Sequence, residues 1–129
     1  MNIIIRLPFP DPSLFPNRRN GQHWGTTAAV KTAARDGAYY ATKQAMKDYK
    51  PQEGPIPLSL LFLTPDRRRR DTDGMLSAAK HGLDGVAAAL GIDDSRFSPI
   101  LVDRALGPKG GALIVAVGVQ IGVVMALPA

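Results

Sequence analysis

The chain has 129 residues, a length that supports one domain around a single hydrophobic core. Its 16 lysines and arginines exceed its 11 aspartates and glutamates, and the net charge of +5 favours an anionic partner, nucleic acid first. The absence of cysteine excludes disulfides and thiolate metal sites, and two histidines are too few for a histidine-rich zinc site. Any catalytic metal is therefore expected to have oxygen ligands, which suits Mg²⁺ or Mn²⁺.

The first half of the chain predicts a strand, a helix and a second strand. Residues 3–7 form a short apolar run that "PFPDP" closes, as expected for a strand before a stiff loop. Thr26 or Thr27 is expected to cap a helix that runs to about Tyr49. The small-residue core face of this helix comprises Val30, Ala34, Ala38, Ala41 and Ala45. Residues 56–63 are apolar at odd and even positions, which predicts a strand covered on both faces.

A basic stripe lies beside the core face of this first helix. It consists of Lys31, Arg35, Lys43 and Lys47, at multiples of four residues, with Tyr39 filling the gap. One interpretation is a surface that lies along a phosphate backbone. The other is an ordinary solvated helix face.

The second half of the chain predicts a helix followed by two strands. The helix is expected from about Asp73 to Leu90, and Gly91 should end it. Its inner face comprises Met75, Leu76, Ala79, Leu83, Val86 and Leu90. Residues 97–105 and 111–118 predict two strands, and "LGPKGG" between them indicates a hairpin. The predicted fold is a single α/β (α+β) domain of order β-α-β-α-β-β, with a four-stranded sheet and two helices.

The two ends of the chain are apolar but differ in what they predict. The opening "MNIIIRLPFPDP" is too short and too quickly broken by proline for a signal peptide, so a cytoplasmic protein is expected. The final "GGALIVAVGVQIGVVMALPA" carries no charge, but its glycines, glutamine and late proline favour a buried strand over a membrane anchor. Its last part, residues 119–129, is an apolar extension that we expect to pack in the core or across a dimer interface.

The most unusual stretch is "TPDRRRRDTDGM", residues 64–75, where four arginines separate Asp66 from Asp71 and Asp73. In extended backbone, residues two apart point to the same side, so Asp71 and Asp73 can reach one cation. The alternative is that Asp73 only caps the following helix while Asp71 pairs with a neighbouring arginine. Capping accounts for one aspartate, but not for two aspartates beside four arginines.

Four polar side chains are spaced to share one face of the second predicted helix. They are Asp73, Ser77, Lys80 and Asp84. Lys80 can assist a reaction at a phosphate, or it can form a surface pair with Asp84 that is worth about 0.3–0.5 kcal/mol. A third carboxylate, from Asp93 or Asp94 in "GIDDSR", can join this group only if the chain folds back after Gly91.

Three of these stretches together resemble the RusA-type Holliday-junction resolvases. They are "PDRRRRDTDG", a helix with Lys and "LDG", and then "GIDDS". The opening "LPFPDPSLFPNRRNGQHW" is similar to that family's amino-terminal segment, so the match spans residues 3–118. The resemblance implies a homodimer that binds branched DNA, such as four-way junctions, and nicks phosphodiesters with Mg²⁺ during recombination or repair. It implies that Asp71, Asp73 and Asp94 hold the metal and that Lys80 assists, as in phage-type members.

The resemblance also bears on DNA binding. Its basic segment is matched by Arg67, Arg68, Arg69 and Arg70, and further phosphates are expected at Arg18, Arg19, Lys31 and Arg35. Aspartates bring a cation that lowers the pKa of bound water and stabilises developing charge, and arginines offset their repulsion of DNA. The mixed charge is thus expected to serve one reaction.

Two positions depart from the family pattern. The usual Asn after D-x-D is Gly74, and the lysine of the best-known subtype is replaced by Ser77. They keep open an alternative, a catalytically impaired protein of the same fold that binds branched or duplex DNA. A third interpretation is a metal-free structural protein that assembles through its apolar tail.

Overall fold

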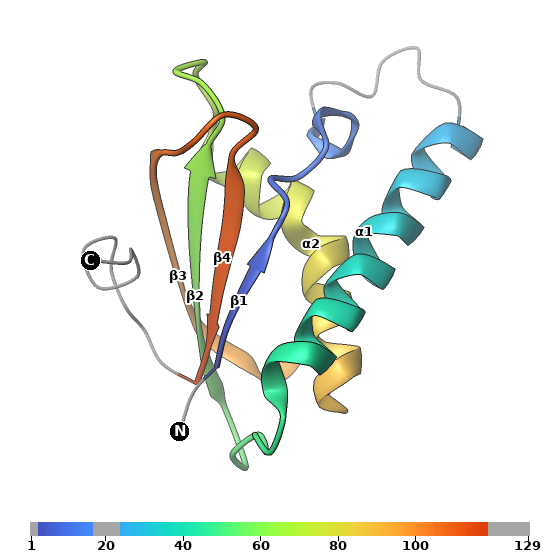
Figure 1. The fold of residues 1–129 in the computed structure, drawn as a ribbon, viewed down its shortest axis with the longest axis vertical. Coiled ribbons are helices and arrows are strands. Elements are labelled where there is room, and N and C mark those ends of the chain that lie inside the picture. The colour runs from blue at the N-terminus through green and yellow to red at the C-terminus, as the bar shows by residue number, and fades with distance from the viewer. Residues whose placement is uncertain (1–2, 17–23, 119–129) are drawn as a thin grey trace.

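A computed structural model of the chain describes residues 3–16 and 24–118. Its strands are β1 (Ile3–Leu7), β2 (Ile56–Thr64), β3 (Phe97–Leu106) and β4 (Ala112–Val117). Its helices are α1 (Trp24–Met46) and α2 (Thr72–Leu90), with short 3-10 turns η1 (Pro12–Leu14) and η3 (Asp94–Arg96). The order β-α-β-α-β-β, the four-stranded mixed sheet and the two helices confirm the predicted α+β domain (Figure 1).

The element bounds follow the local signals closely, with one exception. Helix α1 already includes Trp24, so neither Thr26 nor Thr27 caps it, and it ends at Met46 before the buried Tyr49. Helix α2 ends as predicted, because Gly91 adopts the left-handed conformation (φ 72°, ψ 29°) that glycine tolerates best.

The predicted hairpin between the last two strands is wrong. The strand order is β1-β4-β2-β3, with β4 antiparallel to β1 and β2 and with β3 parallel to β2. Strand β2 is apolar on both faces and lies inside the sheet, where it separates β3 from β4. The connecting segment 107–111 therefore crosses the end of β2.

Two glycines make this crossing possible. The Gly107 N–H donates to the Thr64 carbonyl at 2.8 Å. A Cβ atom at Gly107 would lie 2.6 Å from the Leu63 Cβ, and one at Gly111 would lie 2.6 Å from the Leu63 carbonyl oxygen. Glycines in "LGPKGG" are thus required by the close approach of this segment to β2 as well as by a turn.

Both helices cover the same face of the sheet (Figure 1). Between them lies the main core, to which β1, β2 and β4 contribute alternate residues and α2 its predicted inner face. Its members include Ile5, Leu58, Leu60, Phe62, Met75, Ala79, Leu83, Val86, Leu113 and Val115. A smaller cluster on the other face contains Leu61, Leu63, Ala112 and Ile114, which confirms that β2 is covered on both faces.

Helix α1 packs closely against α2 through small residues. Ala38, from its predicted core face, is 2% exposed, whereas Val30 and Ala34 are only half-buried. A Cβ atom at Gly85 of α2 would lie 2.1 Å from the Arg35 carbonyl oxygen, so only glycine fits there. The contact sets where the exposed face of α2 points.

The parallel pairing of β2 and β3 decides where the polar residues lie. Ile56 pairs with Phe97 at the start of the two strands, and Thr64 pairs with Leu106 at their end. The arginine run follows Thr64, whereas η3 precedes Phe97. Helix α2 therefore leads from the end of β2 back to the start of β3. None of the described helices is long and apolar enough to cross a membrane. Residues 119–129, whose packing was predicted, lie outside the described residues.

Candidate functional site

The four consecutive arginines do not have equivalent surroundings. The Arg70 side chain is 13% exposed, pairs with Asp66 at 3.1 Å and donates to the Arg68 carbonyl at 3.1 Å. Its guanidinium also lies 5.2 Å over the Phe9 ring, which is a cation–π contact. The three arginines before it are exposed. Arg70 therefore stabilises the loop, and the other three present positive charge to solvent.

Asp66 belongs to the same loop rather than to a metal site. The Arg68 N–H donates to the Asp66 carboxylate at 2.8 Å. This hydrogen bond, followed by the Arg70 guanidinium, lowers the pKa of Asp66 below its usual range. Asp66 is thus kept ionised by the loop that it organises.

Asp71 and Asp73 follow the loop and keep their carboxylates available. Asp71 occupies the N-cap position of α2 (φ −79°, ψ 144°), but its side chain makes no capping hydrogen bond. Asp73 lies inside the first turn, so the alternative in which Asp73 caps the helix is wrong. In the part of the chain that the structure describes, no ion pair joins Asp71 to an arginine. Both side chains are exposed.

A polar cavity of about 500 Å³ opens at the start of α2. We name it the arginine–aspartate cavity, and its lining residues are Arg69, Arg70, Asp71, Thr72, Asp73 and Arg104. It brings two uncommitted carboxylates and three guanidinium groups to one surface. Such a surface can bind a divalent cation and a phosphate side by side.

Arg104, from β3, and Thr72 are members of this cavity that the sequence did not predict. The Arg104 guanidinium donates to the Arg70 carbonyl and, at 2.6 Å, to the Thr72 Oγ1. A signal was present, because Arg104 is a basic residue near the carboxyl end of a predicted strand. The erroneous hairpin hid it, since only parallel pairing with β2 brings that end of β3 beside the arginine run.

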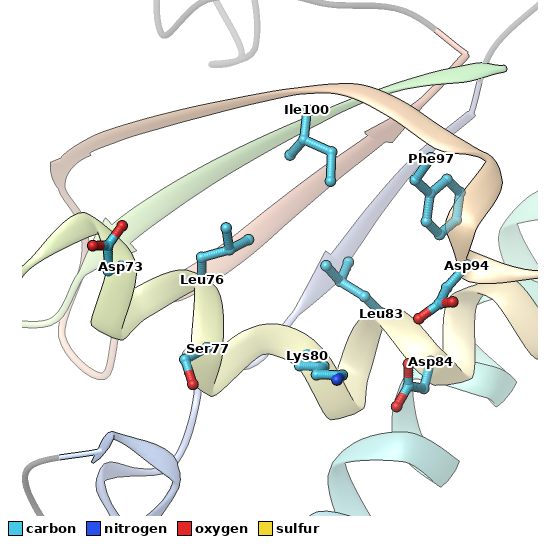
Figure 2. A pocket seen from close by; sticks show the side chains of 9 residues that line it. All are labelled: Asp73, Leu76, Ser77, Lys80, Leu83, Asp84, Asp94, Phe97 and Ile100. Atoms are coloured by element: carbon cyan, nitrogen blue, oxygen red, sulfur yellow. The ribbon is translucent and has the colours of Figure 1, made fainter.

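A second cavity, of about 350 Å³, runs along α2 (Figure 2). This helix-face cavity is lined by Asp73, Leu76, Ser77, Lys80, Leu83, Asp84, Asp94, Phe97 and Ile100. The predicted grouping of polar residues on one face of α2 is therefore confirmed. The predicted pair between Lys80 and Asp84 is not formed, because the ion pairs of the described residues do not include it. The Lys80 ammonium remains exposed beside an apolar wall.

The structure also separates the two aspartates of "GIDDSR". Asp93 caps η3, and its carboxylate accepts the Ser95 N–H at 2.9 Å. Asp94 instead faces the helix-face cavity, beside Asp84 (Figure 2). Hydrogen bonding with Asp93, and then with Asp84, raises the pKa of Asp94 above its usual range. Of the two candidates, Asp94 is thus the one that lines the helix-face cavity, whereas Asp93 caps η3.

The three predicted metal ligands do not meet within one protomer. Asp73 lies at one end of the helix-face cavity and Asp94 at the other (Figure 2). Asp84, beside Asp94, follows Asp73 by eleven residues of helix, which corresponds to about 16 Å. Among the described residues, no three acidic or histidine side chains are grouped closely enough to hold a metal. The reason is topological. After Gly91 the chain begins β3 beside the start of β2, whereas the arginine run follows the end of β2.

Asp71 and Asp73 nonetheless suit a hard divalent cation. Mg²⁺ prefers oxygen ligands and is often bound by one or two carboxylates together with substrate phosphates. Within the described residues, neither carboxylate is engaged in a hydrogen bond or ion pair that would have to break first. The donor set at the start of α2 therefore fits the metal, and Asp94 of the same protomer does not complete it.

The remaining predicted DNA-binding residues lie on α1 or outside the described residues. On α1, Arg35 is exposed, about 4.0 Å from Asp36, and Lys31 is half-buried. Lys43 lies 5.6 Å over the Tyr39 ring on the same helix. Arg18 and Arg19 belong to residues 17–23, which the structure does not describe. The basic stripe is thus present on a helix surface, without a contact that assigns it to DNA.

Comparison with known proteins finds a relative that matches most of this chain. No family model matches the chain. An uncharacterized protein of Xylella fastidiosa (strain Temecula1 / ATCC 700964) is 36% identical over 118 residues, which cover 89% of this chain and 76% of the relative. An identity of this size over most of both chains indicates common descent. The chain therefore belongs to the same family as this Xylella fastidiosa protein.

Proposed function

We propose that the protein is a Mg²⁺-dependent, structure-selective endonuclease that nicks phosphodiesters at Holliday junctions or other branched DNA. The observation that carries this proposal is the arginine–aspartate cavity, where uncommitted carboxylates lie directly beside exposed arginines. The resemblance of the same stretch to RusA-type resolvases supports branched DNA as the substrate. On this proposal the protein acts in the cytoplasm, in recombination or repair.

The residues divide into three groups by the charge that they carry. Asp71 and Asp73 would hold the cation, which supplies Lewis-acid activation of water and stabilises the charge that develops on phosphate. The exposed arginines, Arg67, Arg68 and Arg69, neutralise neighbouring phosphates and release counterions. Lys80 lies along the same face of α2, where its ammonium can contact a phosphate that enters the helix-face cavity.

A second copy of the chain would complete the site. The third carboxylate, Asp94, lies at the wrong end of α2 to join Asp71 and Asp73 of its own protomer. In a two-fold dimer, the far end of one α2 can meet the start of the other, and the same contact then occurs twice. Two such sites in one dimer also suit a junction, in which two strands are nicked symmetrically.

The direct test is a nicking assay on a synthetic four-way junction with Mg²⁺. The wild-type protein should nick the junction, and Asp73→Asn should reduce the rate by at least about 100-fold, because the variant loses a ligand charge at similar size. Asp48→Asn, which removes an exposed carboxylate near the end of α1, is the matched control and should nick normally. Equal nicking by wild type and Asp73→Asn would contradict the assignment.

A second candidate function is binding of branched or duplex DNA without catalysis. It is favoured by the absence of a complete three-carboxylate group among the described residues. This candidate predicts salt-sensitive DNA binding, but no nicking under any of Mg²⁺, Mn²⁺ or Ca²⁺. The nicking assay with a metal series separates the two functions.

A further inference from the structure

We propose that Arg104 is a positioning residue, which holds the Arg70 carbonyl and the Thr72 hydroxyl on either side of Asp71 so that the Asp71 carboxylate stays free to bind a divalent cation. This inference rests on the proposed function, because it assigns Arg104 a role toward the metal of that site. Arg104 would act through Asp71 and would not touch the cation itself.

The contacts of Arg104 define this role. One terminal nitrogen donates to the Arg70 carbonyl, and the other donates to the Thr72 Oγ1 at 2.6 Å. These two acceptors flank Asp71 in the chain, and they are 34 and 32 residues away from Arg104. A planar guanidinium with fixed donor directions can hold two such points at once, whereas an ammonium group cannot reproduce the fork.

The conformation of Asp71 indicates that the two Arg104 contacts would keep its carboxylate from capping the helix. An aspartate at an N-cap position usually accepts a hydrogen bond from one of the free N–H groups in the first helical turn. The Asp71 main chain has the extended conformation of an N-cap residue, and its carbonyl accepts the Met75 N–H at 3.0 Å. Its carboxylate makes no such bond. A carboxylate that closed onto the helix would be lost to the metal.

The position of Arg104 on the sheet supports the same role. Arg104 pairs with Phe62 in the parallel register of β2 and β3, two residues before these strands end at Thr64 and Leu106. The backbone that presents Arg104 is thus part of the sheet, while the segment that it holds is the junction between the arginine loop and the start of α2. A rigid element that supports a loop-borne ligand is the usual arrangement for outer partners of metal ligands.

A direct contact between Arg104 and a DNA phosphate is the competing role, and two measurements on the full chain separate the roles. The first is Mn²⁺ affinity without DNA, followed by electron paramagnetic resonance. The second is the salt dependence of junction binding in Ca²⁺. Arg104→Lys keeps the charge but loses the fork, so it should weaken Mn²⁺ binding by about 10-fold while the salt dependence stays that of wild type.

Two further variants keep the test decisive. Thr72→Val removes one of the two clamped atoms at similar size and should weaken Mn²⁺ binding by a smaller factor. Arg6→Lys, on the opposite edge strand β1, is the matched control and should change neither measurement. Thermal unfolding of each variant confirms that the protein measured is folded.

The outcomes distinguish this inference from the proposed function. Wild-type Mn²⁺ affinity in both Arg104→Lys and Thr72→Val overturns the positioning role and leaves the nuclease proposal standing. Arg104→Ala with normal Mn²⁺ affinity, but with the salt slope reduced by about one, assigns Arg104 to phosphate instead. A wild-type protein that neither binds Mn²⁺ nor nicks junctions overturns both proposals.

Discussion

The two ends of helix α2 carry similar acidic groups in opposite electrostatic surroundings. At its start, Asp71 and Asp73 share a cavity with three arginines. At its far end, Asp84, Asp93 and Asp94 lie together, and the nearby Arg96 is directed away, to the carbonyls of Gln52 and Gly54. At the far end, hydrogen bonds with Asp93 and then Asp84 raise the pKa of Asp94, whereas in the arginine loop the Arg68 N–H and then the Arg70 guanidinium lower the pKa of Asp66.

This difference indicates which end of α2 can bind phosphate without a further cation. Carboxylates that lie beside arginines can receive phosphate without strong repulsion. At the far end, Asp84 and Asp94 share their cavity with Lys80 but form no ion pair with a cation among the described residues, and a metal or a second protomer can supply that charge. The two ends are therefore complementary, and three predictions test that relationship.

The largest expected effect is the rescue of activity by mixing two inactive variants. Asp73→Asn and Asp94→Asn should each fail to nick a four-way junction. If each site combines the start of one α2 with the far end of the other, a mixed dimer has one site without either substitution and one with both. Co-refolded protein should therefore recover roughly one site in four and should nick one strand of a junction.

The control for this experiment is a mixture of Asp71→Asn with Asp73→Asn. Both substitutions lie at the start of α2, so every site in their mixed dimer lacks one ligand and no activity should return. A mixture of Asp73→Asn with Asp94→Asn that remains inactive, although the subunits have exchanged, would show that the two ends of α2 do not meet.

An intermediate effect is expected from the unequal arginines at the start of α2. The double variant Arg68→Ala/Arg69→Ala should weaken DNA binding and reduce the slope of log affinity against log salt by about two, one for each lost phosphate contact. Arg70→Ala should change this slope little. It should instead destabilise the fold by about 1 kcal/mol, because the cation–π contact with Phe9 is lost.

Fluorescence anisotropy at several salt concentrations, together with thermal unfolding, measures both quantities. Equal loss of salt dependence in Arg70→Ala and in a single Arg69→Ala variant would mean that Arg70 leaves the loop to bind DNA. The contrast between the buried and exposed arginines would then be wrong.

The smallest expected effect is an opposite response of the two ends to acid. The folded-state pKa of Asp94 lies above its unfolded value, so its contribution is present below that value and is lost as pH rises through the folded pKa. Asp84→Asn removes one of the groups that raise the pKa of Asp94, so the variant loses less stability when Asp94 ionises. The variant should therefore match the wild type below about pH 4 and unfold at a slightly higher temperature near neutral pH.

Asp66 gives the comparison for the other end. Its folded-state pKa is lowered, so its stabilising contribution is present above the unfolded pKa and is lost as pH falls below about 4. Asp66→Asn should unfold at a lower temperature than wild type at neutral pH, and the difference should shrink in acid. The same sign of pH dependence for Asp84→Asn and Asp66→Asn would contradict the electrostatic contrast.

Part of the candidate site could be predicted from sequence because it depends on local spacing. The side-by-side placement of Asp73, Ser77 and Lys80 follows from the 3.6-residue repeat of one helix, and Figure 2 shows them along one cavity. The different roles of Asp93 and Asp94 could not be predicted. The two aspartates are adjacent, and only the structure shows which of them caps η3 and which faces the cavity. The contacts of Arg104 depend on strand order, which no local pattern encodes.

The sequence by itself determined the elements, because apolar periodicity, proline and a glycine after the last helical turn act over a few residues. It also determined that β2 is covered on both faces, since its apolar residues fall at odd and even positions. Only the tertiary structure decided that β2 lies between β3 and β4, and that Arg70 packs on Phe9 while its neighbours face solvent. It also decided that Asp94 lies beside Asp84, at the other end of the helix-face cavity from Asp73. These outcomes depend on which distant segments gain most by pairing, and that balance of burial and backbone hydrogen bonding is settled only when the whole chain packs.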